Sequence, residues 1–354
     1  MPDLPFATAP FARALLDWYD HSGRDLPWRN TRDPYRIWLS EIMLQQTTVA
    51  AVLTYYERFL ARFPTLVALA EAPLEEVIDQ WAGLGYYSRA RNLHAAAGQV
   101  VARFGGVFPG EVQQLQELPG IGRSTAGAIA ALAFDQPAAI LDANVRRVLC
   151  RLFALRQPAR SSMAEKQLWH WAEALLPATR LHDYTQAMMD LGAMVCLPRQ
   201  PLCPQCPVHF CCQAAALGIQ EAVPVGAQKK PIPVRHEAVL LLHCHGRYQV
   251  RRRPVDGFLG GLWEFPAVGL PNATPGMAAV RQYLLQSGLT GDVESLGRIR
   301  HSYSHFHLEA EIFRVVLPAA QRTAEADGTW KTVAELLPLA LHGAHRKVLE
   351  KLSQ

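Results

Sequence analysis

Leu118-Pro119-Gly120-Ile121-Gly122-Arg123-Ser124-Thr125 is the most informative segment of this 354-residue chain. Pro119-Gly120 cannot continue the helix that precedes it. Gly120 and Gly122 enclose the single apolar residue Ile121, which predicts a tight turn whose backbone amides point outward at the start of the next helix. Such a short turn suits a phosphodiester backbone better than a nucleoside triphosphate. A plain hinge between two helices explains the pattern equally well.

Asp142 follows this turn and directly precedes a helical pattern that begins with Val145, Val148 and Leu149. The break at Pro137 separates it from the alanine-rich helix expected over residues 123–134. An Asp in this position is most often a helix N-cap, and the carboxylate is expected to remain ionised.

The composition is that of a soluble globular protein, with 50% hydrophobic and 19% charged residues and a formal net charge of +4. This small positive excess permits a polyanionic partner without requiring one. No signal-peptide pattern opens the chain, and no apolar run approaches the roughly 18 residues that a membrane span needs. The expected location is therefore the cytoplasm, associated with the nucleoid if DNA is the partner.

Five of the seven cysteines lie close together in the sequence. Cys196, Cys203, Cys206 and Cys212 have the spacing C-x6-C-x2-C-x5-C, and Cys211 adjoins the last of them. In a reducing compartment such a group indicates a metal site rather than disulfides. Four thiolates can hold a zinc ion or a [4Fe–4S] cluster, and a single C-x2-C pair is less typical of zinc.

Glu41 lies in a helix that starts at Asp33-Pro34 and buries apolar residues on both sides of it. This setting predicts a partly buried carboxyl group with a raised pKa, although a lone Glu in a helix is usually exposed. Gln45, Gln46 and Thr47 follow as an uncharged polar patch, which indicates either contacts to base edges or an ordinary polar helix end.

Two aromatic loops have both a structural and a functional interpretation. Leu26-Pro27-Trp28-Arg29 is either a support for the first helix or one wall of a base pocket. Trp81-Ala82-Gly83-Leu84-Gly85-Tyr86-Tyr87 opens a helix that carries Arg89, and it suits either core packing or intercalation into a duplex with phosphate contacts.

The composition changes at the proline-rich, basic segment 223–233. Helical patterns fill the chain before it, and no strand pattern occurs before residue 235. Beyond it, strands are expected at 238–242, 248–250, 292–300 and 306–317, with helices near 275–287 and 342–352. We therefore expect a helical domain over 1–222, a linker over 223–235 and an α+β domain over 236–354.

The hairpin at 118–122 followed by Asp142 resembles the helix-hairpin-helix DNA glycosylases, and the cysteine spacing resembles their cluster loop at 196–212. The other motifs are similar to those of the MutY-type adenine DNA glycosylases over nearly the whole chain. The resemblance implies a multidomain protein with an all-α helix-hairpin-helix glycosylase domain and an α+β, Nudix-like C-terminal domain. It also implies a structural [4Fe–4S] cluster on Cys196, Cys203, Cys206 and Cys212.

The same resemblance assigns roles to individual residues. Glu41 becomes the general acid, Asp142 the carboxylate that faces the anomeric carbon, and Asn144 a residue that orients Asp142 or water. The remaining matches are a backbone-binding hairpin, an adenine pocket, duplex-wedging residues and a segment that inspects the opposite 8-oxoguanine. The hairpin residues are Gly120, Gly122 and Ser124, and the pocket residues are Trp28, Arg29 and Gln186. The duplex-wedging residues are Gln45, Gln46, Thr47, Leu84 and Tyr86, and the inspecting segment carries Tyr303, Ser304 and His305. Arg89 is expected to contact DNA phosphate.

At three places the sequence departs from the motifs of the families it resembles, and these departures narrow the range of expected activities. Ser124 occupies the position of the lysine that endonuclease III-type lyases use as a Schiff-base nucleophile, so a monofunctional glycosylase is expected. Ala143 replaces the glycine that many relatives carry between the Asp and the Asn. The segment 278–288, which matches the magnesium-binding Nudix helix, contains no carboxylate, so pyrophosphate hydrolysis is not expected.

The resulting hypothesis is a monomeric enzyme that removes adenine from double-stranded DNA where adenine is mispaired with 8-oxoguanine or guanine. One alternative is an endonuclease III-like glycosylase and lyase that acts on oxidised pyrimidines. A second alternative, from another class, is a non-catalytic iron–sulfur protein that binds DNA or senses redox state.

Overall fold

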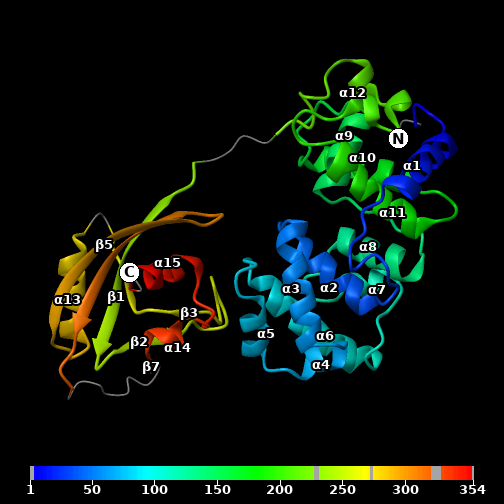
Figure 1. Ribbon diagram of the computed structural model, residues 1–354. Coiled ribbons are helices and arrows are strands. Elements are labelled where there is room, and N and C mark those ends of the chain that lie inside the picture. The colour runs from blue at the N-terminus through cyan, green and yellow to red at the C-terminus, as the bar shows by residue number, and fades with distance from the viewer. Residues whose placement is uncertain (1–3, 227–230, 272–273, 320–327, 353–354) are drawn as a thin grey trace. The chain divides into compact units, whose positions relative to one another are not determined.

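The computed structural model describes residues 4–226, 231–271, 274–319 and 328–352 (Figure 1). The backbone contacts divide the chain into two compact units, one formed by 1–71 with 92–229 and the other by 72–91 with 230–354. The linker expected over 223–235 falls partly outside the described residues, at 227–230. No helix in the described ranges combines the length and hydrophobicity that a membrane crossing requires.

Helices dominate the first unit, as the sequence predicts. Its longer elements are α1 (Thr8–Ser22), α2 (Pro34–Leu44), α3 (Val49–Arg62), α6 (Ser88–Phe104), α8 (Arg123–Phe134), α9 (Ala143–Leu152), α10 (Ser162–Ala174) and α11 (Leu181–Asp190). The shorter ones are α4 (Leu66–Glu71), α7 (Val112–Gln116), the π-helix η1 (Leu191–Val195), the 3-10 turns η2 (Cys203–Gln205) and η3 (His209–Cys211), and α12 (Gln213–Ala216). A core of apolar side chains from α1, α8, α9, α10 and α11 holds this unit together.

The predicted hairpin joins α7 to α8. Gly120 has a φ of +78°, and a Cβ atom there would lie 2.8 Å from Cβ of Asn92, so a glycine is required on both conformational and steric grounds. Gly122 is the N-cap of α8 and contributes no capping side chain, which leaves the first amides of that helix without a side-chain partner.

Helix α8 is built from small residues because another segment passes directly against it. A Cβ atom on Gly127 would lie 2.2 Å from the carbonyl oxygen of Ala139. The backbone therefore approaches α8 at contact distance just before Asp142. Ser124 adds a second link, since its Oγ accepts a hydrogen bond of 3.0 Å from the amide of Leu141. These two contacts fix where the chain enters α9.

The second unit contains a mixed sheet with the strand order β3-β2-β1-β6-β5. Strands β1 (Val234–Cys244) and β6 (His307–Val316) pair in parallel, whereas β5 (Asp292–Ser302) and β2 (Arg247–Arg252) pair antiparallel to their neighbours. The short strands are β3 (Trp263–Glu264), β4 (Ala267–Gly269) and β7 (Thr329–Lys331), and the helices are α5 (Leu74–Trp81), α13 (Gly276–Gln286), α14 (Val333–Leu336) and α15 (Gly343–Leu352).

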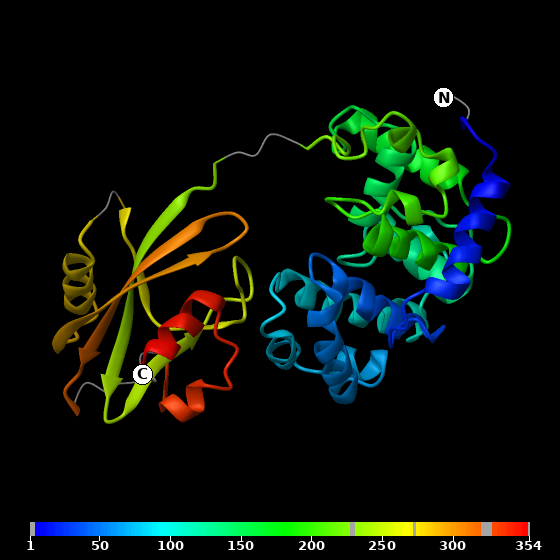
Figure 2. The same cartoon turned by 45° about the horizontal axis from the view of Figure 1, so that its top comes forward.

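Alternation along β1 explains the layers of this unit. Val239 and Leu241 pack with the side that carries α15, and Leu240 and Leu242 pack with α13. Figure 2 shows α13 and α15 on opposite faces of the sheet. The four predicted strands and two predicted helices are confirmed, whereas β3, β4, β7 and α14 were not predicted.

Candidate active site

A cavity of about 260 Å³ lies within the first unit, between α2, α9, α11 and the loop that follows α1. Its lining includes Trp28, Arg29, Glu41, Thr47, Asp142, Asn144 and Gln186, which the sequence singled out from distant segments. The volume is slightly below the roughly 300 Å³ at which cavities for drug-sized ligands begin, and it suits one small planar group.

Glu41 enters this cavity from α2 between two buried neighbours, Ser40 and Ile42. Within the described part of the chain, its carboxyl group has neither a hydrogen bond nor an ion pair. Burial and, second to it, the nearby charge of Asp142 raise the pKa of Glu41 against the opposing charge of Arg29, and the result of the three is a pKa of about 7. The predicted shift is therefore present, and the group is poised to carry a proton near neutral pH.

Asp142 is the N-cap of α9, and its Oδ1 accepts a hydrogen bond of 2.7 Å from the amide of Val145. Burial raises the pKa of Asp142, which the expectation of a simply ionised carboxylate did not include. Backbone hydrogen bonds from Val145 and Asn144 and the charges of Arg147 and Arg146 act in the opposite direction and favour the carboxylate. The side chain of Asp142 therefore both caps α9 and lines the cavity.

Asn144 is held in place from two sides. Its Oδ1 accepts a hydrogen bond of 2.8 Å from Arg147, one turn further along α9. A Cβ atom on Gly192 would lie 2.6 Å from Cβ of Asn144, so η1 packs directly against this residue. Arg147 also donates to the carbonyl oxygens of Gly192 and Cys196, which fixes α9 against the segment leading to the cysteines.

Helix α11 presents three polar side chains, spaced four residues apart, on one buried face. Gln186 accepts a hydrogen bond of 2.6 Å from the hydroxyl of Tyr19, and its Nε2 lies 2.6 Å from Nε2 of His182. His182 Nδ1 in turn contacts the carbonyl oxygen of Leu132 at 2.8 Å. The sequence identified only Gln186. The four-residue spacing of His182, Gln186 and Asp190 in a largely buried helix is the signal that would have found all three.

Asp190 is fully buried and is neutralised by two arginines from the loop after α1. Arg24 donates to it from its backbone amide at 3.0 Å and from Nε at 2.7 Å, and Arg29 donates through both terminal nitrogens. Trp28, beside Arg29, is buried and meets Tyr56 edge-on at 5.2 Å. The loop therefore forms one wall of the cavity and is anchored to α11 and α3.

The polar patch after α2 lies beside the same cavity. Gln45 donates to the hydroxyl of Thr125 at 3.3 Å, and the hydroxyl of Thr47 contacts the carbonyl oxygen of Gln45 at 3.4 Å. Gln46 is exposed and has a φ of +57°, a conformation in which a non-glycine residue is uncommon.

Leu84 and Tyr86, in the loop between α5 and α6, and Arg89, in the first turn of α6, belong to the second unit. Tyr86 is 41% exposed, whereas Leu84 and Arg89 are buried. The guanidinium of Arg89 donates to the carbonyl oxygens of Leu84 and Gly85 at 3.2 and 3.1 Å. Arg89 therefore shapes the loop, and it does not present a free guanidinium to a phosphate as the sequence suggested.

The five clustered cysteines, from Cys196 to Cys212, lie in the segment that follows η1. Burial raises the pKa of Cys206 to about 12, and Cys196, Cys212 and Cys203 act on it as neighbouring thiols. Cys211 interacts in this way only with Cys212. Arg151 donates to Sγ of Cys196 at 3.3 Å. Within the described ranges, no three His, Cys, Asp or Glu side chains are gathered closely enough to hold a single metal ion.

In the second unit, the turn between β5 and β6 carries Tyr303, Ser304 and His305. Ser304 and His305 are exposed. Tyr303 is half-buried, and its hydroxyl lies 3.0 Å from Nδ1 of His342. The turn therefore offers two of the three residues to solvent and retains the third within its own domain.

Two family profiles match the chain. The first is that of the HhH-GPD superfamily base excision DNA repair proteins, over residues 39–174, and the second is that of the NUDIX domain, over residues 238–351. A thermostable thymine-DNA glycosylase of known structure is 32% identical, covers 59% of this chain and 97% of its own, and superposes with a TM-score of 0.55. Fold and site together therefore define a helix-hairpin-helix DNA glycosylase with a Nudix-like domain.

Curated relatives narrow this class. Adenine DNA glycosylase of Rattus norvegicus is 37% identical, covering 98% of this chain and 78% of that protein, and that of Homo sapiens is 36% identical, covering 96% and 73%. The chain belongs to the adenine DNA glycosylase family. A non-covalent endonuclease III–DNA complex, at 22% identity and a TM-score of 0.51, shares the helical fold over 61% of this chain and 99% of its own.

Proposed function

We propose that this enzyme is a monofunctional glycosylase that excises adenine mispaired with 8-oxoguanine or guanine in double-stranded DNA. The observation that carries the proposal is that Glu41 and Asp142, from helices about 100 residues apart, line one small cavity in contrasting environments. Glu41 has no partner among the described residues, whereas Asp142 accepts backbone hydrogen bonds. Contrasting environments are what separate an acid from a carboxylate in glycosidic cleavage.

Glu41 is the general acid in this mechanism. With a pKa of about 7 it holds a proton near neutral pH, and it donates that proton to a ring nitrogen of the extruded adenine. Protonation turns the purine into a neutral leaving group when the bond to the sugar breaks. After the base departs, the Glu41 carboxylate accepts a proton from the water that attacks the anomeric carbon.

Asp142 supplies negative charge to the oxocarbenium-like sugar. Its hydrogen bond from Val145 fixes the carboxylate at the start of α9, and the α9 arginines favour its ionised form. Asn144, fixed by Arg147 and η1, orients Asp142 or the attacking water.

Gln186 is the residue that recognises the adenine edge. A carboxamide has two N–H donors and one carbonyl acceptor. The oxygen already accepts from Tyr19 and one side of the nitrogen faces His182, which leaves one N–H for the ligand. Trp28 and Arg29 form the wall beside it.

Ser124 is the basis for proposing that the enzyme cleaves the base and not the strand. A hydroxyl cannot form an imine with the sugar, and this one is engaged with the amide of Leu141. An endonuclease III-like lyase would leave nicked DNA before any alkali treatment, whereas the proposed enzyme leaves abasic sites that nick only afterwards.

The duplex is held by the hairpin amides at Gly120 and Gly122, with the exposed Tyr86 as the wedge and Leu84 supporting it. Gln45, Gln46 and Thr47 are proposed to contact the opposite strand, and Ser304 and His305 are proposed to inspect the opposite base. We further propose that the enzyme acts as a monomer on cytoplasmic, nucleoid-associated DNA.

We propose a structural [4Fe–4S] cluster on Cys196, Cys203, Cys206 and Cys212. The four thiols interact with one another, and their C-x6-C-x2-C-x5-C spacing, with a single C-x2-C pair, favours a cluster over zinc. The guanidinium of Arg151 on Cys196 stabilises a thiolate. Cys212→Ser is expected to lose iron and the visible absorption of the cluster, whereas the matched control Cys211→Ser is expected to retain both. If Cys211→Ser also loses its iron and its visible absorption, or if Cys212→Ser retains them, the assignment of Cys212 as a ligand is contradicted.

The decisive experiment is the release of labelled adenine from a duplex with one A:8-oxoguanine pair, compared with a T:8-oxoguanine control. We expect release from the first duplex alone, with strand nicks only after alkali. Release of adenine from an A:T pair at the same rate would contradict the mispair specificity. DNA binding without any release would favour the non-catalytic alternative.

A further inference from the structure

The carboxamide of Gln186, which lines the catalytic cavity, has two orientations that exchange its oxygen and its nitrogen. We build here on the proposed function, in which this group reads the adenine edge. A carboxamide pairs with adenine when its N–H meets a ring nitrogen and its oxygen meets the exocyclic amino group. The reversed orientation sets acceptor against acceptor and donor against donor. Recognition therefore requires that the orientation be fixed before the base enters.

His182, one turn before Gln186 on α11, fixes the nitrogen of the carboxamide. Nδ1 of His182 lies 2.8 Å from the carbonyl oxygen of Leu132, near the end of α8. A carbonyl oxygen can only accept, so Nδ1 carries the proton and Nε2 of the neutral ring carries a lone pair. Nε2 of Gln186 lies 2.6 Å from that Nε2 and must donate to it. The carbonyl oxygen of Leu132 thus selects the tautomer of His182, and the tautomer selects the orientation of Gln186.

Tyr19, on α1, fixes the oxygen of the same carboxamide. The guanidinium of Arg29 donates a hydrogen bond to the hydroxyl group of Tyr19. The single O–H of Tyr19 is therefore directed elsewhere, and it donates to Oε1 of Gln186 at 2.6 Å. Two independent contacts, from α1 and from α11, thus require the same orientation. One N–H and one lone pair of Gln186 are left over for a base.

The charges around His182 bear on whether its ring is neutral. Burial, the largest cause, lowers the pKa of His182, and Arg32 acts in the same direction. The hydrogen bond to Leu132 and the charges of Asp183 and Asp135 oppose them, and the net direction is downward. The neutral ring is therefore the resting form at neutral pH. Protonation would place an N–H on Nε2, which would then meet the N–H of the carboxamide and favour its reversal.

We propose that His182 is a positioning residue for base recognition, whose Nε2 lone pair holds the Gln186 carboxamide in the orientation that adenine requires. It acts through Gln186 and exchanges no proton with the substrate. The selected base is a purine whose edge carries a ring-nitrogen acceptor beside an amino group. A purine with a carbonyl group at that place meets the oxygen of the carboxamide instead.

Three variants of the full chain test this role by single-turnover release of adenine from an A:8-oxoguanine duplex. His182→Leu removes the acceptor, and we expect the rate to fall about 10-fold. His182→Gln restores an acceptor, because its side-chain oxygen is as many bonds from Cα as Nε2 of histidine, and we expect a rate within about 3-fold of the parent. The control is His21→Leu, at an exposed histidine of α1 outside the cavity, with an unchanged rate. Thermal melting and iron content verify folding.

Two further readouts separate positioning from packing. In a Gln186→Leu background there is no carboxamide to orient, so His182→Leu should cause no additional loss of rate. The ratio of the parent rate to the His182→Gln rate should fall as the pH decreases through the pKa of His182, because only the parent gains an N–H at this position. An additional 10-fold loss in the Gln186→Leu background, a flat ratio, or equal defects in His182→Leu and His182→Gln would each overturn the proposal.

Nitrogen NMR of the labelled chain without DNA distinguishes a failure of this proposal from a failure of the proposed function. We expect a neutral His182 ring with its proton on Nδ1 at pH 7, and the signal is assigned by its loss in His182→Leu. A proton on Nε2 at that pH overturns the proposal whatever the enzyme does. The expected tautomer without any release of adenine by the parent chain contradicts the proposed function and leaves the orienting contact in place.

Discussion

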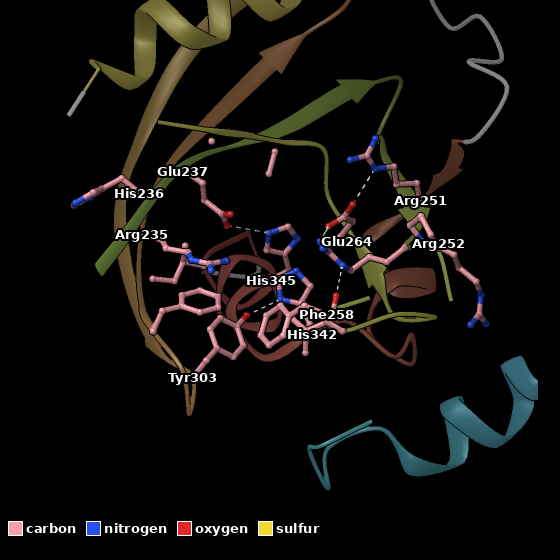
Figure 3. A pocket seen from close by; sticks show the side chains of 17 residues that line it. Arg235, His236, Glu237, Arg251, Arg252, Phe258, Glu264, Tyr303, His342 and His345 are labelled. Atoms are coloured by element: carbon pink, nitrogen blue, oxygen red, sulfur yellow. Dashed lines mark hydrogen bonds and ion pairs between the residues drawn. The ribbon is translucent and has the colours of Figure 1, made fainter. Parts of the chain in front are cut away.

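The two units contain carboxyl groups in opposite settings, Glu41 in the helical unit and Glu264 in the Nudix-like domain. In the helical unit, Glu41 is enclosed without a hydrogen bond or ion pair from any described residue, and its pKa is raised to about 7. In the Nudix-like domain, Glu264 is also buried, in the lining of the pocket shown in Figure 3, but it pairs with two arginines, Arg251 and Arg253. Burial alone therefore does not produce a catalytic acid. The absence of a cationic partner is what keeps a carboxyl group protonated and reactive.

The largest expected effect is on the rate. Glu41→Gln removes the proton donor but preserves the shape of the side chain, so adenine release should fall about 10²–10⁴-fold while mispair affinity is retained. Single-turnover kinetics and a DNA-binding assay measure the two quantities. Glu264→Gln should instead lower the melting temperature of its domain. A loss of rate from Glu264→Gln as large as that from Glu41→Gln would break the comparison.

Asp190 offers a related comparison, because it is a buried carboxylate whose two partners, Arg24 and Arg29, line the same cavity as Glu41. Asp190→Asn leaves the buried guanidinium of Arg29 without its counter-charge, so we expect a loss of about 4 kcal/mol in the free energy of unfolding. The released charge of Arg29 also favours ionised Glu41, so the alkaline limb of the rate profile should move to lower pH. Denaturant unfolding and a pH–rate profile test both effects, and an unmoved limb would show that Arg29 does not act on Glu41.

Glu41, which has no hydrogen bond or ion pair with any described residue, should itself lower the free energy of unfolding. The pKa of Glu41 rises from 4.5 to about 7 on folding, so the folded state binds more protons between these values and stability falls as the pH rises through that window. The full cost is present above pH 7 and is about 3 kcal/mol at most. Glu41→Gln should therefore be more stable than the parent at pH 8 and nearly equal to it at pH 4. Equal stability at both pH values would contradict the unpartnered state of this group.

The smallest expected effect concerns the exposed turn of the Nudix-like domain. Changing Ser304 and His305 together to Ala should reduce the preference for 8-oxoguanine over guanine a few-fold, since a lost hydrogen bond is worth about 1 kcal/mol. The ratio of adenine release rates from the two mispairs measures this. An unchanged ratio would reject this recognition role for the turn.

The sequence predicted those features that depend on local chemistry. The sequence predicted a tight turn at Gly120, a helix cap at Asp142 and a carboxyl group with a raised pKa at Glu41. The structure has all three. The sequence did not predict the pairing of Asp190, because Arg24 and Arg29 are 166 and 161 residues away. Arg89 was misjudged for a related reason, since only the folded loop shows that its guanidinium points inward. The strands β3 and β7, of two and three residues, are too short to show any periodicity.

The contact between α8 and the carbonyl oxygen of Ala139 has a consequence for how this enzyme can change. Position 127 has no room even for a methyl group, so a main-chain contact fixes where the chain passes α8 just before Asp142. Any larger residue there must displace the extended segment that leads to Asp142, and therefore Asp142 itself. Substitution at position 127 therefore offers no graded way to move Asp142, because even the smallest added side chain meets main-chain atoms.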